Sequence, residues 1–244
     1  MTILLRCAVA AVTMMAVVAM LAEPSARSAP ELLTVTGTAA VIGKGKPAAD
    51  SSGVVVWLEP ADEGVERPRI EPPRTHPRMV QKDKQFEPHL LVVPVGSIVE
   101  FPNLDPYFHN VFSLFDGRRF DLGLYEAGTS RSVTFDKHGV SHVFCNIHPE
   151  MSAVIVALDT PYYAVSSRTG AFTMPDVPPG RYVATAWHER HKLERPRDFP
   201  REVRLSAAAS TLGVVRFVES APLTVAHKNK FGHDYVPVKN GIYK

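Results

Sequence analysis

The chain has 244 residues, of which 45% are apolar and 21% charged, so it has the composition of a globular protein with one large domain or two small ones. This composition excludes a disordered chain, a collagen and a membrane protein with several spans. Lys and Arg total 27 against 25 Asp and Glu, so the chain lacks the basic excess that favours nucleic-acid binding.

The first 28 residues have the features of an export signal. Arg6 is followed by residues 7–22, a run of small and apolar residues that is too short for a typical transmembrane helix. The small residues Ala26 and Ser28 suit a signal peptidase, although cleavage directly after the run is an alternative. We therefore expect residues 1–28 to be removed and the protein to be periplasmic or otherwise exported, without stable membrane insertion. The other interpretation is an uncleaved anchor.

Cleavage would leave a single cysteine. The sequence has 2 Cys, and Cys7 lies within the predicted signal, so only Cys145 remains in the exported chain. No disulfide within that chain is then possible, and an unpaired thiol in an oxidising compartment has to be buried or used. Cys145 is therefore either an inert core residue or a functional one.

From residue 31 onward the sequence predicts an all-β protein. The run Val54-Val55-Val56-Trp57-Leu58 is β-branched and aromatic and is bounded by Gly53 and Pro60, as is typical of a strand. Further strand-like runs are residues 33–40, 89–93, 97–101, 131–135, 142–145, 152–158, 171–174, 181–188, 202–205 and 213–219. Residues 60–94 contain seven prolines, which favours an extended connection. Many short strands separated by turn residues indicate β-sandwiches or barrels.

A metal-ligating pattern stands out in one loop. Cys145, His148 and Met151 offer a thiol, an imidazole and a thioether within seven residues at a strand end, and His109 in a preceding strand offers a second imidazole. Two His and one Cys in a plane, with a distant Met, are the ligands of a type 1 copper centre. We expect one copper ion at these four residues. The alternatives are unrelated residues or a zinc site, although zinc seldom binds Met.

Residues 79–158 resemble the cupredoxins, the small blue copper proteins that include plastocyanin and amicyanin. The segments that carry the resemblance are Gln85-Phe86-Glu87-Pro88, residues 93–103 (VPVGSIVEFPN), His109-Asn110-Val111, Val133-Thr134-Phe135 and residues 144–151 (FCNIHPEM). The two-residue gap before Met151 is similar to the amicyanin loop. The resemblance implies a Greek-key β-sandwich in which Asn110 helps to tie the two ligand loops together. The long charged connection at residues 114–131 departs from the family pattern.

Residues 31–60 and 161–219 together resemble the transthyretin-like, carboxypeptidase-regulatory-like β-sandwich. The matching motifs are Val35-Thr36-Gly37-Thr38, Thr169-Gly170-Ala171-Phe172 and Val177-Pro178-Pro179-Gly180-Arg181-Tyr182. We predict that the cupredoxin domain is inserted into this discontinuous sandwich, whose core would hold Trp57 and Trp187, and that residues 220–244 form a tail. The combination of such a sandwich with a cupredoxin domain is similar to that in exported proteins labelled as methylamine-utilisation proteins.

The predicted function is one-electron transfer between redox protein partners, without enzymatic activity and without nucleic acid. Multicopper oxidases hold additional coppers with His-x-His pairs, and this sequence has none. The alternatives are a periplasmic copper-binding or delivery protein and an accessory subunit of a redox enzyme. Delivery would favour Met- and His-rich tracts, which the sequence also lacks. Within the site, the ring edge of His148 is the expected exit for electrons, because Pro149 turns the chain outward there.

Overall fold

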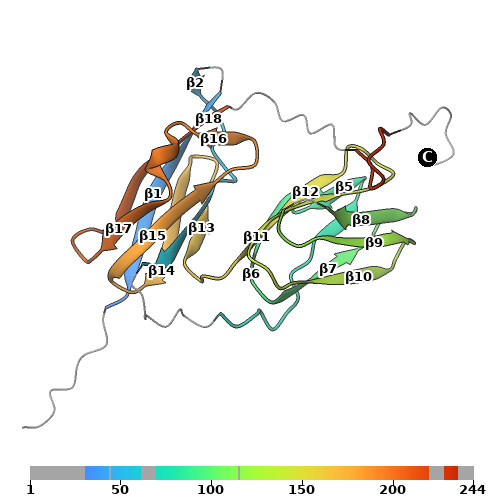
Figure 1. The fold of residues 1–244 in the computed structure, drawn as a ribbon, viewed down its shortest axis with the longest axis horizontal. Helices are drawn as coiled ribbons and strands as arrows, with labels where there is room; N and C mark the ends of the chain where they lie inside the picture. Colours follow the sequence, from blue (N-terminus) through green and yellow to red (C-terminus); the bar gives the residue numbers. More distant parts are fainter. Residues whose placement is uncertain (1–30, 44, 62–69, 115, 220–227, 236–244) are drawn as a thin grey trace, which may run out of the picture. The chain divides into compact units, whose positions relative to one another are not determined.

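The computed structural model of the protein describes residues 31–43, 45–61, 70–114, 116–219 and 228–235 (Figure 1). The predicted export signal, residues 1–28, lies outside the described residues, as do residues 220–227 and 236–244 of the predicted tail. Within the described ranges almost every element is a strand, and the exception is a 3-10 turn at Pro196–Asp198. The all-β prediction is therefore confirmed. None of the helices among the described residues has the length and apolar character needed to span a membrane.

One pair of sheets combines strands from residues 33–60 with strands from residues 163–219. Its strands are β1 (Leu33–Gly43), β2 (Lys46–Pro47), β3 (Val55–Pro60), β13 (Tyr163–Val165), β14 (Ala171–Val177), β15 (Gly180–Trp187), β16 (His191–Leu193), β17 (Arg201–Leu205) and β18 (Thr211–Glu219). The order is β14-β1-β18-β16 in one sheet, with β2 on β1, and β13-β3-β15-β17 in the other. The early strands β1 and β3 thus find most of their partners more than 100 residues later in the chain.

Alternation of side chains builds the core between these two sheets. In β1 the buried residues include Val35 and Val41, and in β15 they include Tyr182 and Ala184, while their neighbours along each strand are more exposed. All four belong to one hydrophobic cluster. Successive side chains of a strand point to opposite faces, so a two-residue period buries one face of each sheet.

The remaining strands form the part of the molecule that carries the predicted ligands. They are β4 (Val80–Lys82), β5 (Gln85–Glu87), β6 (Leu90–Pro94), β7 (Ser97–Pro102), β8 (His109–Ser113), β9 (Phe120–Tyr125), β10 (Ser130–Phe135), β11 (Gly139–Phe144) and β12 (Ser152–Leu158). The five-stranded sheet has the order β6-β12-β11-β8-β9, β10 pairs with β7, and β4 pairs with β5. Phe101 of β7, Phe135 of β10 and Ile155 of β12 share its core.

Strand β9 corrects the expectation of a long connection at residues 114–131. It pairs antiparallel with β8, which contains the predicted ligand His109. Tyr125 is buried, and Phe120 and Leu122 pack against the same core as β7 and β10. The charged residues just before β9 and Gly123 within it obscure the apolar alternation that makes this segment a strand.

A third hydrophobic cluster explains why two strands lack alternation. In β12, Ile155 faces the core of its own sheets, whereas Val154 and Val156 pack with Val55 and Trp57 of β3. Both strands are therefore buried on both faces, which calls for a continuous apolar run. Trp57 belongs to this cluster and Trp187 packs against it. Neither belongs to the core between the sheet of β1 and the sheet of β3, so their predicted place in that core was wrong.

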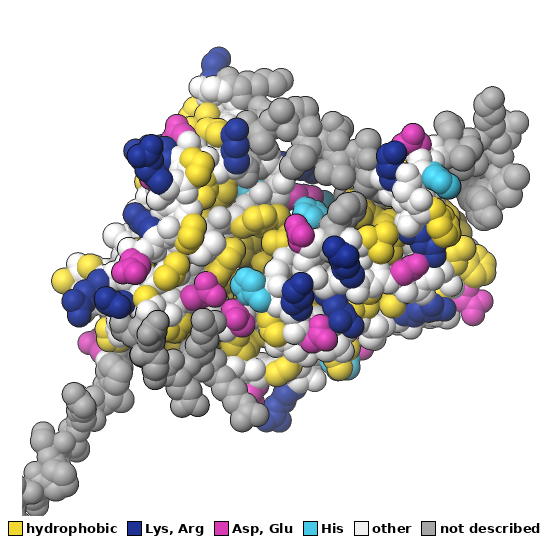
Figure 2. All heavy atoms as spheres, in the orientation of Figure 1, with side chains coloured by type: hydrophobic (Ala, Val, Ile, Leu, Met, Phe, Trp, Pro, Cys, Tyr) yellow, Lys and Arg dark blue, Asp and Glu magenta, His cyan; other side chains and the backbone are white. Residues whose placement is uncertain are grey.

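The surface carries no segregation of charge on the face drawn in Figure 2. Lys and Arg side chains lie interspersed with Asp and Glu there, in keeping with the 27 basic and 25 acidic residues of the chain.

The turn at Gly170 offers a test of this architecture. Gly170 has a φ of +82°, and a Cβ at this position would lie 1.9 Å from the backbone oxygen of Ala39 in β1. Gly213 has a φ of +67° but open space around it. Because Gly170→Ala adds a backbone clash to the dihedral strain, we expect it to lower the free energy of unfolding by about 3 kcal/mol or more. Gly213→Ala should cost about 1–2 kcal/mol. Urea unfolding measures both, and equal losses would contradict the described packing of β1.

Candidate metal centre

Two neighbouring strands bring the predicted ligands together. His109 is the first residue of β8, and Cys145 directly follows the last residue of β11. These strands are antiparallel neighbours, joined at Phe144 and Phe112, so the start of one lies beside the end of the other. The loop from residue 146 to Met151, just before β12, then carries the remaining candidates.

The three donor atoms of His109, Cys145 and His148 form a small triangle. The Sγ atom of Cys145 lies 3.8 Å from Nδ1 of His109 and 3.6 Å from Nδ1 of His148, and the two nitrogens lie 3.1 Å apart. A first-row metal ion binds imidazole nitrogen at about 2.0–2.1 Å and thiolate sulfur at about 2.3 Å, which keeps its ligand atoms about 3.3–3.8 Å apart. The observed distances fit this arrangement, with the nitrogens slightly closer.

Met151 closes the loop beside the triangle. The N–H of Met151 donates to the carbonyl of His148 at 3.1 Å, and the N–H of Cys145 donates to the carbonyl of Met151 at 3.2 Å. The Met151 side chain is fully buried in the same hydrophobic cluster as Cys145. Its thioether therefore lies inside the protein, in the cluster that contains the thiol.

Burial distinguishes the four candidate ligands. His109, Cys145 and Met151 have 0% relative exposure, whereas His148 has 8%. Buried polar groups require partners in place of water. Two imidazoles and a thiol that face one another in a buried site thus have the chemistry of a metal-binding set, and only His148 reaches the surface.

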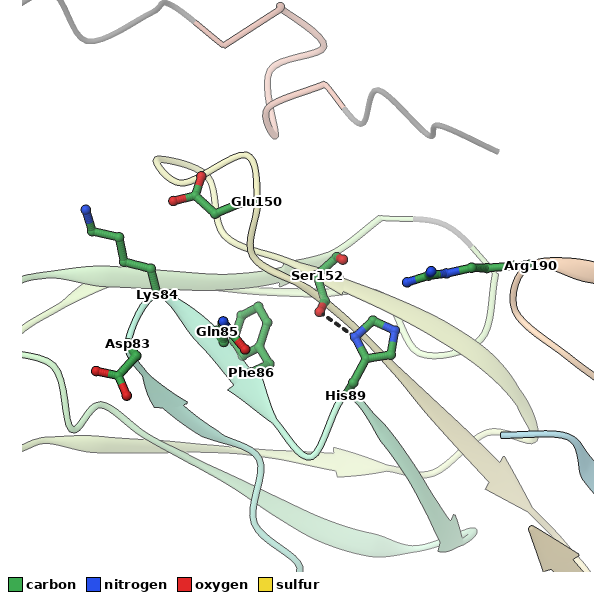
Figure 3. A pocket seen from close by; sticks show the side chains of 8 residues that line it. All are labelled: Asp83, Lys84, Gln85, Phe86, His89, Glu150, Ser152 and Arg190. Atoms are coloured by element: carbon green, nitrogen blue, oxygen red, sulfur yellow. Dashed lines mark hydrogen bonds between the residues drawn. The ribbon is translucent and has the colours of Figure 1, made fainter. Parts of the chain in front are cut away.

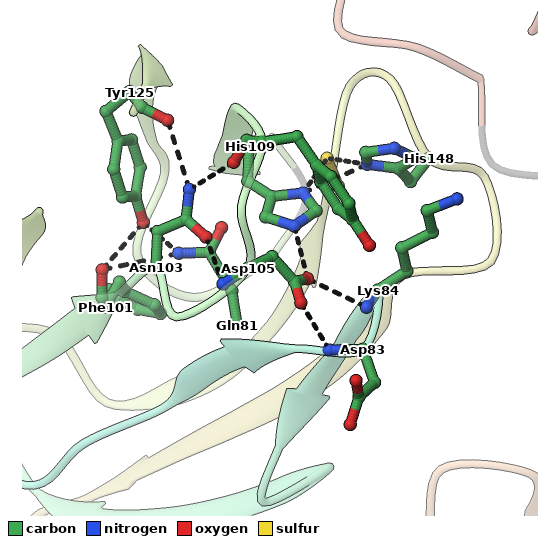
Figure 4. A network of polar contacts seen from close by, with 11 residues as sticks. Gln81, Asp83, Lys84, Phe101, Asn103, Asp105, His109, Tyr125 and His148 are labelled. Carbon is green, nitrogen blue, oxygen red and sulfur yellow. Dashed lines mark hydrogen bonds and ion pairs between the residues drawn. The ribbon is translucent and has the colours of Figure 1, made fainter. Parts of the chain in front are cut away.

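A buried carboxylate holds the first imidazole. The Nε2 atom of His109 lies 2.7 Å from Oδ2 of Asp105 (Figure 4), and Asp105 also accepts hydrogen bonds from the N–H groups of Asp83 at 2.7 Å and Lys84 at 2.9 Å. Asp83 and Lys84 have φ values of 53° and 56° and form the turn between β4 and β5. With the ring proton on Nε2, the lone pair of Nδ1 points toward Cys145, as a ligand must.

Further hydrogen bonds fix the loop that contains Asp105. The N–H of Asp105 donates to Oδ1 of Asn103 at 3.1 Å, and Nδ2 of Asn103 donates to the carbonyl of Tyr107 at 2.8 Å. The hydroxyl of Tyr125 donates to the carbonyl of Phe101, in the strand before this loop, at 2.8 Å (Figure 4). The two hydrogen bonds of Asn103 restrain the loop from within, which limits the freedom of the carboxylate.

Burial sets the protonation of the donors. It lowers the pKa of His109, and the hydrogen bond to Asp105 opposes this only in part. Burial and the neighbouring His109 lower the pKa of His148, and burial raises the pKa of the Cys145 thiol. Burial also works against ionisation of Asp105, but the hydrogen bonds that it accepts outweigh this and bring its pKa below the usual range. The imidazoles are therefore neutral, and the thiol loses its proton when a metal binds.

Asn110 takes part in a connection between the ligand strands that runs through two other residues. Its Nδ2 donates to Oδ1 of Asp121 at 2.8 Å, and Oδ2 of Asp121 lies 2.7 Å from Nζ of Lys230. The N–H of Lys230 donates to Oδ1 of Asn146 at 2.9 Å. The side chain of Asn110 therefore reaches the Cys145 loop by way of Asp121 and Lys230.

Sequence reasoning missed several residues around the site, among them Asp105, Asp121, Lys230 and Tyr235, whose hydroxyl donates to the carbonyl of Cys145 at 2.8 Å. Asp105 precedes His109 by four positions as the one charged residue of an otherwise uncharged segment, and this acidic residue just ahead of a predicted ligand was its only signal. Lys230 and Tyr235 had no signal, because they lie in a polar tail far along the chain.

A second group of possible ligands lies elsewhere in the described part of the chain. Glu59, His138 and Asp159 place their donor atoms within 4.8 Å of one another. His138 is exposed, and its Nδ1 pairs with Asp159 at 3.2 Å. An ordinary ion pair between partly exposed side chains accounts for this group.

Comparison with known proteins gives partial structural matches. No protein-family model matches the chain, and neither does any curated protein. A purple cupredoxin from Nitrosopumilus maritimus is 21% identical over 34% of this chain and 99% of its own, with a TM-score of 0.31. A copper-containing nitrite reductase from Thermus scotoductus is 25% identical over 41% of this chain, with a TM-score of 0.34, and the match spans 25% of the reductase. An oxidised amicyanin variant is 22% identical over 34% of this chain and 82% of its own, with a TM-score of 0.32.

The role of Asp105 can be tested by Asp105→Asn. The amide has one acceptor oxygen where the carboxylate has two, so either the His109 proton or the turn at residues 83–84 loses its partner. We expect binding of Co²⁺ to weaken about 10- to 100-fold, measured by chelator competition through the thiolate-to-metal absorption. The control is Asp136→Asn, because Asp136 is exposed and pairs with Arg118. Unchanged affinity in the Asp105 variant would contradict the assigned role.

Proposed function

We propose that the protein binds one copper ion through His109, Cys145, His148 and Met151 and acts as an exported one-electron carrier, without catalytic activity of its own. The observation that carries the proposal is the buried triangle of two imidazole nitrogens and one sulfur, 3.1–3.8 Å apart, with a buried thioether in the same loop. Thiolate and thioether suit Cu(I) while imidazole suits both oxidation states, so this set supports reversible exchange of one electron.

The closed character of the site supports a carrier over an enzyme. Catalytic metal sites keep an open position for water or substrate. Here three of the four proposed ligands have 0% exposure and His148 has 8%, so a substrate has no direct path to the donor atoms. The same burial argues against a delivery protein, because transfer of the ion would require a partner to replace three ligands that have no exposed surface.

The donor set supports copper over zinc. A structural zinc site is completed by four Cys or His ligands, and among the described residues the triangle supplies three of these. The fourth candidate donor is the buried thioether sulfur of Met151, a ligand that zinc seldom recruits. The thioether therefore favours a soft, redox-active ion.

The ligand set is tested by absorption and EPR spectra of the copper-loaded protein. We expect an intense blue thiolate-to-copper band with narrow hyperfine splitting in the natural chain. Cys145→Ser should abolish the band, because no thiolate remains, whereas Met151→Leu should keep it and raise the reduction potential, because an axial ligand tunes the ion without anchoring it. A blue band that survives in the Cys145 variant would overturn the assignment.

We further propose that electrons cross at the exposed edge of His148. Among the four ligands it is the one with measurable exposure, and Leu104 and Phe108, the sequence neighbours of Asp105 and His109, are apolar side chains with 58% and 51% exposure. Exposed apolar side chains suit a small and transient contact with a redox protein. Glu150, two residues beyond His148, lines a polar pocket together with Lys84 and Arg190 (Figure 3). Charges at such a position steer the encounter more than they change the affinity.

Glu150→Lys tests this exit with small redox reagents. We expect oxidation of the reduced protein by anionic ferricyanide to speed up roughly 2- to 10-fold at low ionic strength, and oxidation by a cationic cobalt(III) complex to slow down. The blue band should stay unchanged. The control is Glu202→Lys, an exposed residue of β17 in the other pair of sheets. Identical rates in the Glu150 variant and the natural chain would place the exit elsewhere.

A further inference from the structure

The described part of the predicted tail, residues 228–235, folds into a turn of its own (Figure 1, red). Asn229 organises it: its Oδ1 accepts from the N–H groups of Phe231 and His233, both at 3.0 Å. The N–H of Asn229 donates to the carbonyl of His233 at 2.9 Å, and the N–H of Gly232 donates to the carbonyl of Asn229 at 2.8 Å. Four hydrogen bonds within five residues give this segment a defined shape.

The turn is fastened to the ligand loop at two points. The N–H of Lys230 donates to Oδ1 of Asn146 at 2.9 Å, and the hydroxyl of Tyr235 donates to the carbonyl of Cys145 at 2.8 Å. Cys145 is a proposed ligand, and Asn146 directly follows it. The segment thus contacts the loop where the thiol enters the site, more than 80 residues away in sequence.

The Lys230 side chain extends this contact to the other ligand strand. Its Nζ lies 2.7 Å from Oδ2 of Asp121 in β9, and Oδ1 of Asp121 accepts from Nδ2 of Asn110 at 2.8 Å. Asn110 directly follows His109, just as Asn146 directly follows Cys145. Lys230 therefore connects the residues that follow the two ligands, one through its backbone and one through its ammonium group.

We propose that Lys230 and Tyr235 are positioning residues of the metal centre, which hold the Cys145 loop against β8 and stabilise the reduced ion. The inference rests on the proposed copper-binding function for the identity of the ion. We call the contacts of the turn with Asn146, Cys145 and Asp121 the clamp. The clamp does not depend on which ion is bound.

Electrostatics gives the direction of the effect. The Tyr235 hydroxyl directs a partially positive proton at the carbonyl of Cys145, and the Lys230 ammonium offsets the negative charge of Asp121 beside Asn110. Groups of this kind around a ligand tune a bound metal. Removing the hydroxyl, or leaving Asp121 without its cation, makes the surroundings of the ion more negative. The reduction potential should therefore fall in both variants.

The experiment compares Tyr235→Phe and Lys230→Met in the full copper-loaded chain. We expect each variant to lose copper to a chelator about ten-fold faster than the natural chain and to have a lower reduction potential. Lys230→Arg keeps the cation beside Asp121 and should behave like the natural chain. Loss rates and potentials equal to those of the natural chain in both variants would overturn the proposal.

Two matched controls exclude a general loss of stability. Tyr182→Phe removes a hydroxyl that donates to the carbonyl of Pro178 at 2.8 Å in the other pair of sheets, and Lys228→Met removes an exposed lysine two positions before Lys230. Both controls should leave copper loss and potential unchanged. A control that speeds copper loss as much as its partner variant would count against positioning.

Amide hydrogen exchange in the metal-free protein separates this proposal from the proposed function. Lys230→Met should speed the exchange of the amides at residues 145–151, while the amides of β15 keep their protection. A natural chain that forms no blue copper site would defeat the proposed function, yet faster loop exchange in the variant would still support the clamp. A blue site with unchanged loop exchange would defeat the clamp alone.

Discussion

The buried hydrogen bond between Asp105 and His109 is the constraint on which the geometry of the site depends. Both groups are almost without solvent contact, so neither can exchange its partner for water. The carboxylate is held by the turn between β4 and β5 and in turn directs the ring proton to Nε2. The donor nitrogen of His109 then faces the thiol of Cys145, which follows the neighbouring strand β11. A hairpin outside the ligand sheet thus decides which atom of His109 is available to a metal.

Local pattern predicted most strands, because a β-branched run between turn residues needs no knowledge of its partners. It could not predict what covers them. The runs in β3 and β12 lack alternation because each strand faces a core on one side and the third cluster, around Trp57, on the other. A sequence shows that both faces are apolar but not which distant segment supplies the second cover. Strand β9 was missed for the opposite reason, since Gly123 and nearby charges interrupt its alternation.

The candidate ligands could be named from the sequence because chemistry and spacing coincide there: Cys145, His148 and Met151 share one loop. Their surroundings could not, because these consist of contacts between distant segments. Lys230 meets Asn146 across 84 positions, and Asp121 owes its contact to a strand that the sequence concealed. Asp105 lies near His109 in sequence, but its value as a partner depends on burial, which only the fold determines.

A metal ion that changes charge at a fixed site needs ligands that keep their positions in both oxidation states. The described contacts supply restraint from two directions: the Asp105 carboxylate restrains His109 from inside, and the turn at residues 228–235 restrains the Cys145 loop from its other side. His148 is the ligand that keeps an exposed edge. The rigid groups and the contact group are thus different residues. In the proposed carrier, this separation lets a partner touch one ligand while the other donor atoms keep the geometry that both charge states share.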